Sequence, residues 1–382
     1  MKTIKGYLFA LFFAAITLGC TLLARWYGDV LDTFYPYVTR QLQAILAWLS
    51  GKMPFLVWQG AVYVLAAVLI FSIVMMILKK WRFFRWLGWV LCVVSFGWML
   101  HTCFYGLNYY ASPLSQDIRL ESRPLTQKEL EAATIYFRDN ANALAASMPR
   151  DGDGNLLYDD FETLASKAGE GYENLKMTGY SVFAGSTLPV KRLGWAKLYS
   201  SMGICGVSMA ITGEAAVNPM IPNFSQPFVM CHEMAHRMCI APEDDANFAA
   251  FLACEANGND QFRYSAFYMA YSYCYNELAR ADYAALREIH KEANEFLRRD
   301  MKTYSNFFAK EQNKVATTVA NAANNAYIQA SGDKNGIASY GQVVTQLVNW
   351  YLEKTQDEIS QQAPFDPLDK DYISDILGGD GK

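Results

Sequence analysis

The sequence is poor in histidine and in charged side chains. Only four of its 382 residues are histidine, and Asp, Glu, Lys and Arg together make up 18%. Basic residues do not outnumber acidic ones, because the formal net charge is −4. Nucleic-acid-binding domains carry a strongly basic surface, so we expect no nucleic acid partner.

Cysteine is present, but its pattern does not define a fold. The chain has eight cysteines, three in its apolar N-terminal region and five in the C-terminal part. An odd number with irregular spacing matches neither a disulfide framework nor a four-cysteine zinc site. Small buried apolar residues are the simpler interpretation for most of them.

Apolar residues are abundant, and they gather near the N-terminus. Three long apolar runs cover approximately residues 7–24, 55–78 and 86–108. Each approaches the roughly 20 residues that cross a bilayer as a helix, and aromatic residues lie at their ends. We therefore predict a membrane domain over residues 1–110, embedded in the lipid bilayer, and a polar connector over 111–125. The first run can alternatively be a cleaved signal peptide.

Basic residues predict the orientation of these runs. They precede the first run and fill the short loop between the second and third, and such segments stay in the cytoplasm. We therefore predict a multi-pass protein of the cytoplasmic membrane whose large C-terminal domain is extracytoplasmic. The basic residues are Lys2, Lys5, Lys79, Lys80, Arg82 and Arg85.

The C-terminal part is predicted to be a mainly helical domain over residues 126–357. Thr126 and Glu129 have the spacing of a capping box at a helix start. Glycines and β-branched residues before residue 218 predict a small sheet, with its last strand near 207–217. An acidic tail over 358–382 should be poorly ordered. Helices are expected at about 126–148, 158–167, 225–240, 243–257, 261–283, 284–309, 311–330 and 338–357.

The acidic stretch 151–162 invites comparison with a calcium-binding loop. Acidic or amide residues occupy positions 1, 3, 5, 9 and 12 of an EF-hand loop. Position 6 needs glycine for a sharp turn, but here it is Leu156. We therefore do not expect Ca2+ at 151–162 and interpret the stretch as an acidic turn between helices.

Two of the four histidines lie four residues apart in "VMCHEMAHRMCI", with Glu233 directly after the first. On a helix, His232 and His236 share one face and can bind one metal ion. This is the H-E-x-x-H arrangement of zinc peptidases. There the metal activates a water molecule, and the glutamate transfers a proton from that water to the leaving amine. The apolar flanks predict a buried helix rather than a solvated pair of histidines.

A catalytic zinc ion has three protein ligands and one open position. No third histidine follows nearby, so we expect a carboxylate. Glu243 is the preferred ligand, with Asn247 on the same helical face as a supporting residue. Asp245 and Glu277 are the alternatives. The competing explanation for Glu243 is that acidic residues in a first helical turn are favoured by the helix dipole.

Several motifs resemble a bacterial family of membrane-anchored H-E-x-x-H proteins, a domain of unknown function regarded as zinc metallopeptidases. They are "GEAAVN", "HEMAHR", "APEDDANFAAFLAC", "FRYSAF" and "NGIASYGQVVTQLVNWY", and the resemblance covers nearly the whole chain. The segment from Glu243 to Asn247 is similar to the E-x-x-x-D element of gluzincins, with Asn247 in the position of the aspartate. Family members usually carry glutamate where this chain has Asp245, which favours Glu243 as ligand.

The resemblance implies further site residues. A gluzincin edge strand pairs with the substrate backbone, and Gly213, Glu214 and Ala215 are the candidates here. Arg263 and Tyr264 are candidates for stabilising the oxyanion of the transition state. A buried core strand and ordinary packing are the respective alternatives.

The sequence thus predicts a mainly α protein with three N-terminal transmembrane helices. They precede a helical α+β, gluzincin-like zinc metallopeptidase domain with a small sheet. We expect one Zn2+ ion and hydrolysis of peptides or protein segments near the membrane surface. The alternatives are a non-enzymatic zinc-binding sensor or interaction domain on a membrane anchor, and a structural membrane protein with an incidental H-E-x-x-H.

Overall fold

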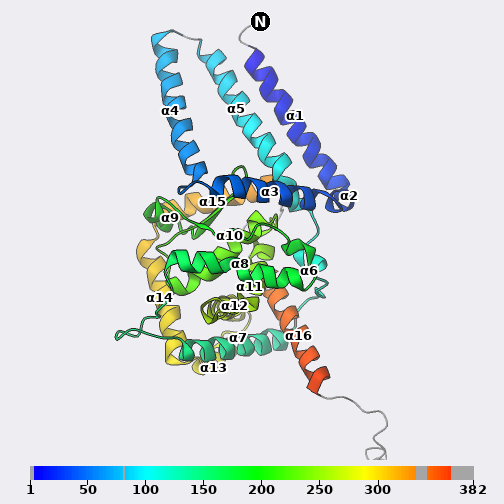
Figure 1. Ribbon diagram of the computed structural model, residues 1–382, viewed down its shortest axis with the longest axis vertical. Coiled ribbons are helices and arrows are strands. Elements are labelled where there is room, and N and C mark those ends of the chain that lie inside the picture. Colours follow the sequence, from blue (N-terminus) through cyan, green and yellow to red (C-terminus); the bar gives the residue numbers. More distant parts are fainter. Residues whose placement is uncertain (1–3, 81, 333–341, 363–382) are drawn as a thin grey trace, which may run out of the picture.

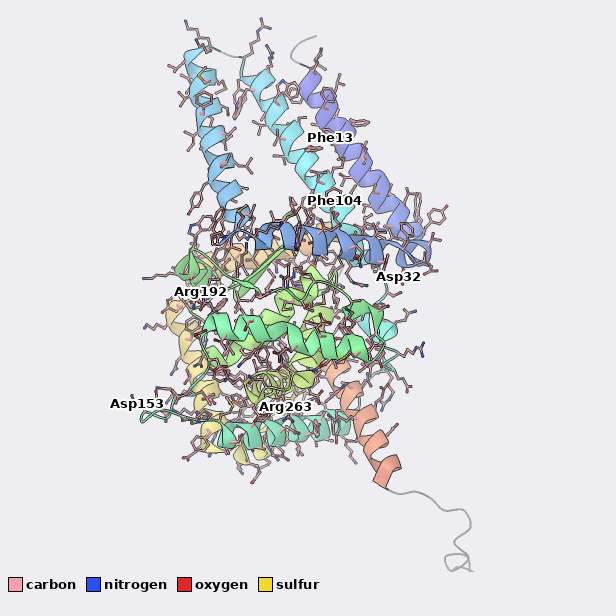
Figure 2. All side chains as sticks on the ribbon, viewed as in Figure 1. Phe13, Asp32, Phe104, Asp153, Arg192 and Arg263 are labelled. Atoms are coloured by element: carbon pink, nitrogen blue, oxygen red, sulfur yellow. The ribbon has the colours of Figure 1, made fainter. Side chains whose placement is uncertain are left out.

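Three long apolar helices extend from one end of the molecule (Figure 1). The computed structural model describes residues 4–80, 82–332 and 342–362. The helices α1 (Lys5–Trp26), α4 (Val57–Leu78) and α5 (Phe83–Phe104) are long and apolar enough to cross a membrane. Many of the apolar side chains on these helices are exposed (Figure 2), although Phe13 of α1 packs against Phe96 of α5. An apolar helix without a protein cover needs lipid around it, which supports the predicted membrane domain.

The segment between the first two of these helices is itself helical. The apolar runs predicted no helix between residues 24 and 55, but the structure forms α2 (Gly28–Asp32) and α3 (Tyr35–Gly51) there. In Figure 1, α3 lies across the ends of the three apolar helices, between them and the rest of the molecule. Tyr35 attaches α3 to the end of α5, because its hydroxyl donates to the backbone carbonyls of Thr102 and Cys103.

The remaining helices pack into one domain around a large apolar core. Its centre contains buried aromatic side chains from α7, α8, α11 and α12, including Phe137, Tyr172, Phe251 and Phe267. The long helices are α7 (Gln127–Ser147), α8 (Phe161–Met177), α10 (Gln226–Arg237), α11 (Glu243–Ala256), α12 (Asp260–Ala281), α14 (Glu295–Glu311), α15 (Lys314–Ser331) and α16 (Gln342–Gln362). The shorter ones are η1 (Gly106–Tyr110), α6 (Leu114–Asp117), η2 (Ser181–Phe183), α9 (Ala196–Met202), η3 (Asn223–Ser225) and α13 (Tyr283–Lys291).

Most predicted helices are present, but α8 continues to Met177 instead of ending near residue 167, and α9 (Ala196–Met202) is a helix that was not predicted. The capping box at the start of α7 is confirmed, since Thr126 and Glu129 bond each other's backbone N–H. The single helix predicted over 284–309 is two helices, because Asn294 caps α14 by accepting from the Leu297 N–H. The predicted connector 111–125 also contributes Leu114 and Leu120 to the core. Residues 338–341 of the last predicted helix and 363–382 of the acidic tail lie outside the described residues.

The small sheet has three strands in the order β1-β3-β2. These are β1 (Lys191–Arg192), β2 (Gly206–Met209) and β3 (Glu214–Val217). Strand β3 is parallel to β1, which pairs with Ala216 and Val217, and antiparallel to β2, which pairs along its whole length. Glu214 and Ala215 are buried, which favours the alternative of a core strand over the prediction that they pair with substrate. Gly213 lies in the turn before β3, with φ +64°.

Candidate metal centre

The helix α10 carries both histidines, and it begins where the sequence predicts. Pro227 lies in its first turn, where a missing N–H costs no hydrogen bond. Ser225 precedes the helix but does not cap it with its side chain. Instead the Phe228 N–H donates to the Ser265 hydroxyl of α12, 3.1 Å away. The start of α10 is therefore attached to a neighbouring helix.

A sharp turn at the end of α10 brings the third ligand back toward the histidines. Cys239 adopts a left-handed backbone conformation, with φ +68°. The Ile240 N–H then donates to the Ala235 carbonyl, the pattern that closes many helix ends. Pro242 follows and precedes the first residue of α11, Glu243. Seven residues therefore suffice to place Glu243 opposite His236.

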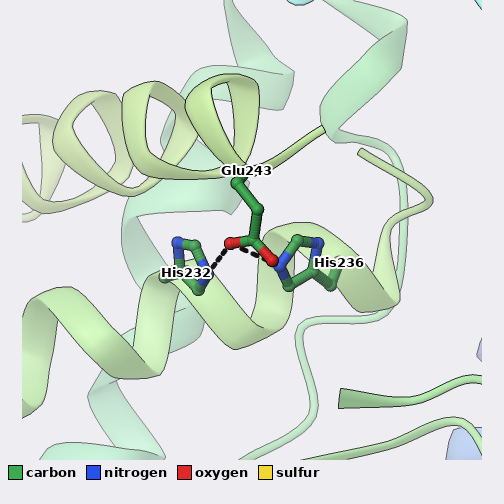
Figure 3. Close-up of side chains that lie close together, drawn as sticks. All are labelled: His232, His236 and Glu243. Carbon is green, nitrogen blue, oxygen red and sulfur yellow. Dashed lines mark ion pairs between the residues drawn. The ribbon is translucent and has the colours of Figure 1, made fainter. Parts of the chain in front are cut away.

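His232, His236 and Glu243 form one cluster (Figure 3). Glu243 Oε2 lies 3.3 Å from His232 Nε2 and 3.7 Å from His236 Nε2. One ligand atom from each residue falls within 4.8 Å of the other two, so the three can hold a single metal ion. Among the described residues, this is the one group of three or more His, Cys, Asp or Glu side chains that lie close enough together to share a metal ion.

His232 and His236 differ in the contacts that their Nδ1 atoms make. His236 Nδ1 lies 2.9 Å from the Ile240 carbonyl, which can accept its proton and orient Nε2 toward Glu243. The Tyr105 hydroxyl lies 3.4 Å from the same nitrogen. His232 Nδ1 is buried and has no hydrogen-bond partner in the described part of the chain.

Glu233 lies on the side of α10 that faces the sheet. It is buried, and its carboxylate lies against the backbone of Gly206 at the start of β2. A Cβ atom at Gly206 would overlap that carboxylate, so this position has to be glycine for Glu233 to keep its place. Glu233 therefore lies between the metal cluster and the edge strand of the sheet.

Burial and the neighbouring charges shift the pKa values in this cluster. Burial raises the pKa of Glu233 to about 7, although the two histidines oppose the shift. Burial alone would also raise the pKa of Glu243, but the histidines lower it well below its usual range. Burial lowers the pKa of His236, yet the Glu243 carboxylate outweighs it and raises the value to about 9. In the absence of metal, His236 and Glu243 therefore form an ion pair.

The alternative ligands lie in other environments. Asp245 accepts hydrogen bonds from the Leu114 N–H and the Gln346 amide, and so joins α11 to α6 and α16. Glu277 forms an ion pair with Arg280 on α12. Neither residue belongs to the metal cluster.

Asn247 is buried one helical turn after Glu243. It accepts a hydrogen bond from the Tyr273 hydroxyl, while its amide nitrogen has no partner among the described residues. The structure shows no bond from this amide to a ligand of the cluster.

The two candidates for oxyanion stabilisation, Arg263 and Tyr264, make their contacts outside the cluster of His232, His236 and Glu243. Arg263 is half-exposed and pairs with Asp260 at the start of α12 (Figure 2). Tyr264 is fully buried, and its hydroxyl donates to Asp300, which also binds Arg150. Tyr264 therefore belongs to a buried structural network on another face of the domain. The prediction that these residues act at the metal centre is not supported by their positions.

Sequence reasoning missed the aromatic residues that approach the cluster from the membrane-proximal side. Tyr105 directly follows α5 and reaches His236, although the two are 131 residues apart. His101 of α5 lies next to Tyr105 and is 3.2 Å from the Tyr327 hydroxyl of α15. The sequence contains no signal for these contacts, since tyrosines at the end of an apolar helix are typical of a membrane interface.

Comparison with known protein families matches residues 31–348 to the family described as "Protein of unknown function (DUF3810)". The matched region includes α3, all three cluster residues and the sheet. No curated protein and no solved structure matches the chain.

Proposed function

The chain belongs to the DUF3810 family, whose function is unknown, and we propose that it is a membrane-anchored zinc-dependent metallopeptidase. The proposal is for a gluzincin-like enzyme that hydrolyses peptide bonds. One Zn2+ ion would be held by His232, His236 and Glu243, and Glu233 would serve as general base and general acid.

The spacing of the three ligand atoms is the observation that carries this proposal. Zinc binds imidazole nitrogen and carboxylate oxygen at about 2.0–2.2 Å, so two ligands of a tetrahedral ion lie roughly 3.3–3.5 Å apart. Glu243 Oε2 lies 3.3 Å and 3.7 Å from the Nε2 atoms of His232 and His236, which is close to this spacing. Two imidazoles and one carboxylate are also the donor set of catalytic zinc in peptidases.

The chemistry divides between the metal and Glu233. Zinc, when bound, supplies a Lewis acid that acidifies a water molecule and polarises the scissile carbonyl. Glu233 would take a proton from the attacking water as the water oxygen bonds to the carbonyl carbon, and would return this proton to the amine nitrogen as the C–N bond breaks. Its carboxylate is buried next to both histidines, where it can make these transfers. The Ile240 carbonyl meanwhile holds the His236 ring in one orientation.

The strand β2 is the better candidate for binding an extended substrate. It is the last strand of the sheet order, so one of its edges is unpaired within the described residues. Gly206 in this strand lies against Glu233. A peptide added along the free edge of β2 would run past that carboxylate. We therefore replace the proposed substrate strand 213–215 with β2.

The place of the cluster favours substrates close to the membrane. Tyr105, which contacts His236, is the first residue after α5. The metal centre is thus one aromatic side chain away from the end of an apolar helix. We propose protein segments near the membrane surface as substrates, on the extracytoplasmic side of the cytoplasmic membrane.

The test measures zinc content and hydrolysis on the purified full chain. We expect one zinc per chain, lost in His232→Ala and Glu243→Ala. Glu233→Gln should keep the zinc but lose about 100-fold or more of the hydrolytic rate, because the general base is gone. A library of quenched fluorescent peptides serves as the substrate probe.

Two variants serve as controls for this test. Glu277→Ala and Asp245→Asn should both keep zinc, since neither residue lies in the cluster. Bound zinc with no hydrolysis of any library peptide would favour a sensor or interaction domain instead. Absence of zinc after reconstitution would leave the H-E-x-x-H incidental and overturn the proposal.

A further inference from the structure

The helix α3 has an unusual distribution of side chains for a helix attached to a folded domain. Its polar residues Thr39, Arg40, Gln43 and Ser50 are buried against the protein. Five of its large apolar or aromatic side chains are exposed instead, and among the exposed side chains of α3 only Gln41 is polar. This outward face consists of Tyr37, Val38, Gln41, Ile45, Trp48 and Leu49.

The inner face of α3 is held by specific hydrogen bonds, so the helix cannot simply be rotated. Arg40 donates from Nε to the Met238 carbonyl at 3.0 Å and from Nη1 to the Ser181 carbonyl at 3.1 Å. Gln43 donates to the Ala210 carbonyl at 2.9 Å. Rotating α3 to bury its apolar side would leave these buried carbonyls without donors.

The outward face is large and far from being covered. Tyr37 is 65% exposed, Val38 57%, Ile45 56% and Trp48 55%. A surface helix of a soluble domain normally turns such a face inward and its polar face to water. The reversed arrangement in α3 requires an apolar environment outside the protein.

The position of α3 identifies that environment. The chain enters α3 from α1 through α2 and leaves it toward α4, so both neighbours in sequence lead to apolar helices. In Figure 1, α3 lies across the ends of those helices rather than parallel to them. The exposed side chains Val315 and Val319 of α15 lie one turn apart on a helix at the same level. Lys52, just after α3, lies 3.4 Å from the Trp48 ring centre, a pairing suited to the boundary of lipid and water.

We propose that α3 lies in the plane of the membrane interface, with its outward face in contact with the lipid bilayer. The occupant of this face is lipid, because α3 lies across the ends of the apolar helices α1 and α4, to which the chain connects it on both sides. Amphipathic helices bind the interface in this way, with the apolar side inserted below the head groups. Since Arg40 binds the carbonyl of Met238 at the end of α10, this contact also holds the candidate metal-binding helix at a fixed distance from the bilayer surface.

The test uses the full chain reconstituted into phosphatidylcholine–phosphatidylglycerol vesicles. Nitroxide labels are attached to Ile45→Cys and Val38→Cys on the outward face. The control is Lys128→Cys, an exposed position on α7, which lies at the end of the domain away from the apolar helices (Figure 1). Signal from native cysteines is subtracted with the unsubstituted protein. Relaxation by molecular oxygen, which concentrates in lipid, is compared with relaxation by a polar nickel chelate, which stays in water.

For labels at positions 45 and 38, relaxation by oxygen should exceed relaxation by the nickel chelate several-fold. For the label at position 128, relaxation by the nickel chelate should be the larger. The two outward positions give independent results, so failure of one variant to fold does not remove the test. Nickel access at both positions equal to that at Lys128 would show a face in water and overturn the proposal. Protection from both reagents would show that a protein, such as a second copy of the chain, covers the face, and would equally overturn it. None of these readouts depends on zinc or hydrolysis.

Discussion

At the scale of single residues, the metal centre depends on a short turn rather than on the histidines alone. The left-handed Cys239 ends α10, and Pro242 starts α11, so Glu243 returns to the face that carries His232 and His236. The same turn supplies the Ile240 carbonyl that orients His236. One local structure therefore positions both a ligand and the group that holds another ligand.

Zinc affinity should depend on pH through His236. The Glu243 carboxylate raises the pKa of His236 to about 9, so without metal the ring is protonated at neutral pH. Zinc binds only the neutral ring and must displace this proton, so affinity should rise as pH rises toward that pKa, about tenfold per pH unit. Calorimetry in buffers with different heats of ionisation would count the proton released. An affinity that stays constant between about pH 6 and 8 would contradict the assigned protonation.

Gly206→Ala should separate catalysis from metal binding. The new Cβ atom would overlap the Glu233 carboxylate and displace it, while the three ligands stay in place. A shift of about 1 Å in a catalytic group can cost roughly 100-fold in rate, so we expect a loss of that order in kcat. Zinc content should not change. Gly258→Ala is the matched control, because a Cβ there meets open space; an equal loss in both variants would disprove the role of Gly206.

At the scale of elements, one buried carboxylate attaches an apolar helix to the sheet. Glu214 of β3 accepts hydrogen bonds from the Val57 and Trp58 N–H groups at the start of α4. Lys191 of β1 lies 2.7 Å from the same carboxylate. Glu214 thus satisfies N–H groups that a helix start leaves without partners, and it connects the membrane domain to the sheet.

Glu214→Ala should therefore destabilise the protein strongly. It would leave two backbone N–H groups without an acceptor and remove the charge partner of Lys191, which keeps its hydrogen bonds to the Ser50 and Phe55 carbonyls. Breaking a buried ion pair costs about 3–5 kcal/mol. The free energy of unfolding in mild detergent, from a urea titration, provides the measurement. Glu162→Ala removes only the exposed ion pair with Arg192 and should change the free energy of unfolding far less. Equal losses in the two variants would mean that Glu214 does not anchor α4.

At the scale of the whole molecule, the metal centre and the apolar helices form one connected unit. Tyr105 joins α5 to the metal cluster, and Arg40 joins α3 to the end of α10. Tyr327 of α15 adds a contact to His101. The domain is therefore not freely tethered, and its candidate metal site is built partly from residues adjacent to the apolar helices.

The predicted orientation can be tested with a membrane-impermeant maleimide on intact cells. Asp153→Cys lies on an exposed loop of the domain (Figure 2) and should be labelled directly. Lys80→Cys lies in the basic loop between α4 and α5 and should be labelled only after permeabilisation, because basic loops stay in the cytoplasm. Labelling of both positions from the same side would refute the proposed topology.

Features that depend on local pattern could be predicted from the sequence. The three apolar helices follow from run length, and the start of α7 follows from the spacing of Thr126 and Glu129. His232 and His236 share a helical face by periodicity alone, and Glu243 was the preferred third ligand on spacing and chemistry. In each case the residues that interact are close in sequence, so their spacing along the chain determines how they lie relative to one another.

Features that depend on distant contacts were decided only by the tertiary structure. The central place of β3 depends on β1 pairing with it, and the burial of Tyr264 depends on Asp300. The reversed faces of α3 could not be foreseen, because its polar side chains are buried only when the carbonyls of Met238 and Ala210 are brought to them. Periodicity predicts that a helix has a polar and an apolar face. Which face is buried depends on the residues that pack against each side, and only the folded chain brings those residues together.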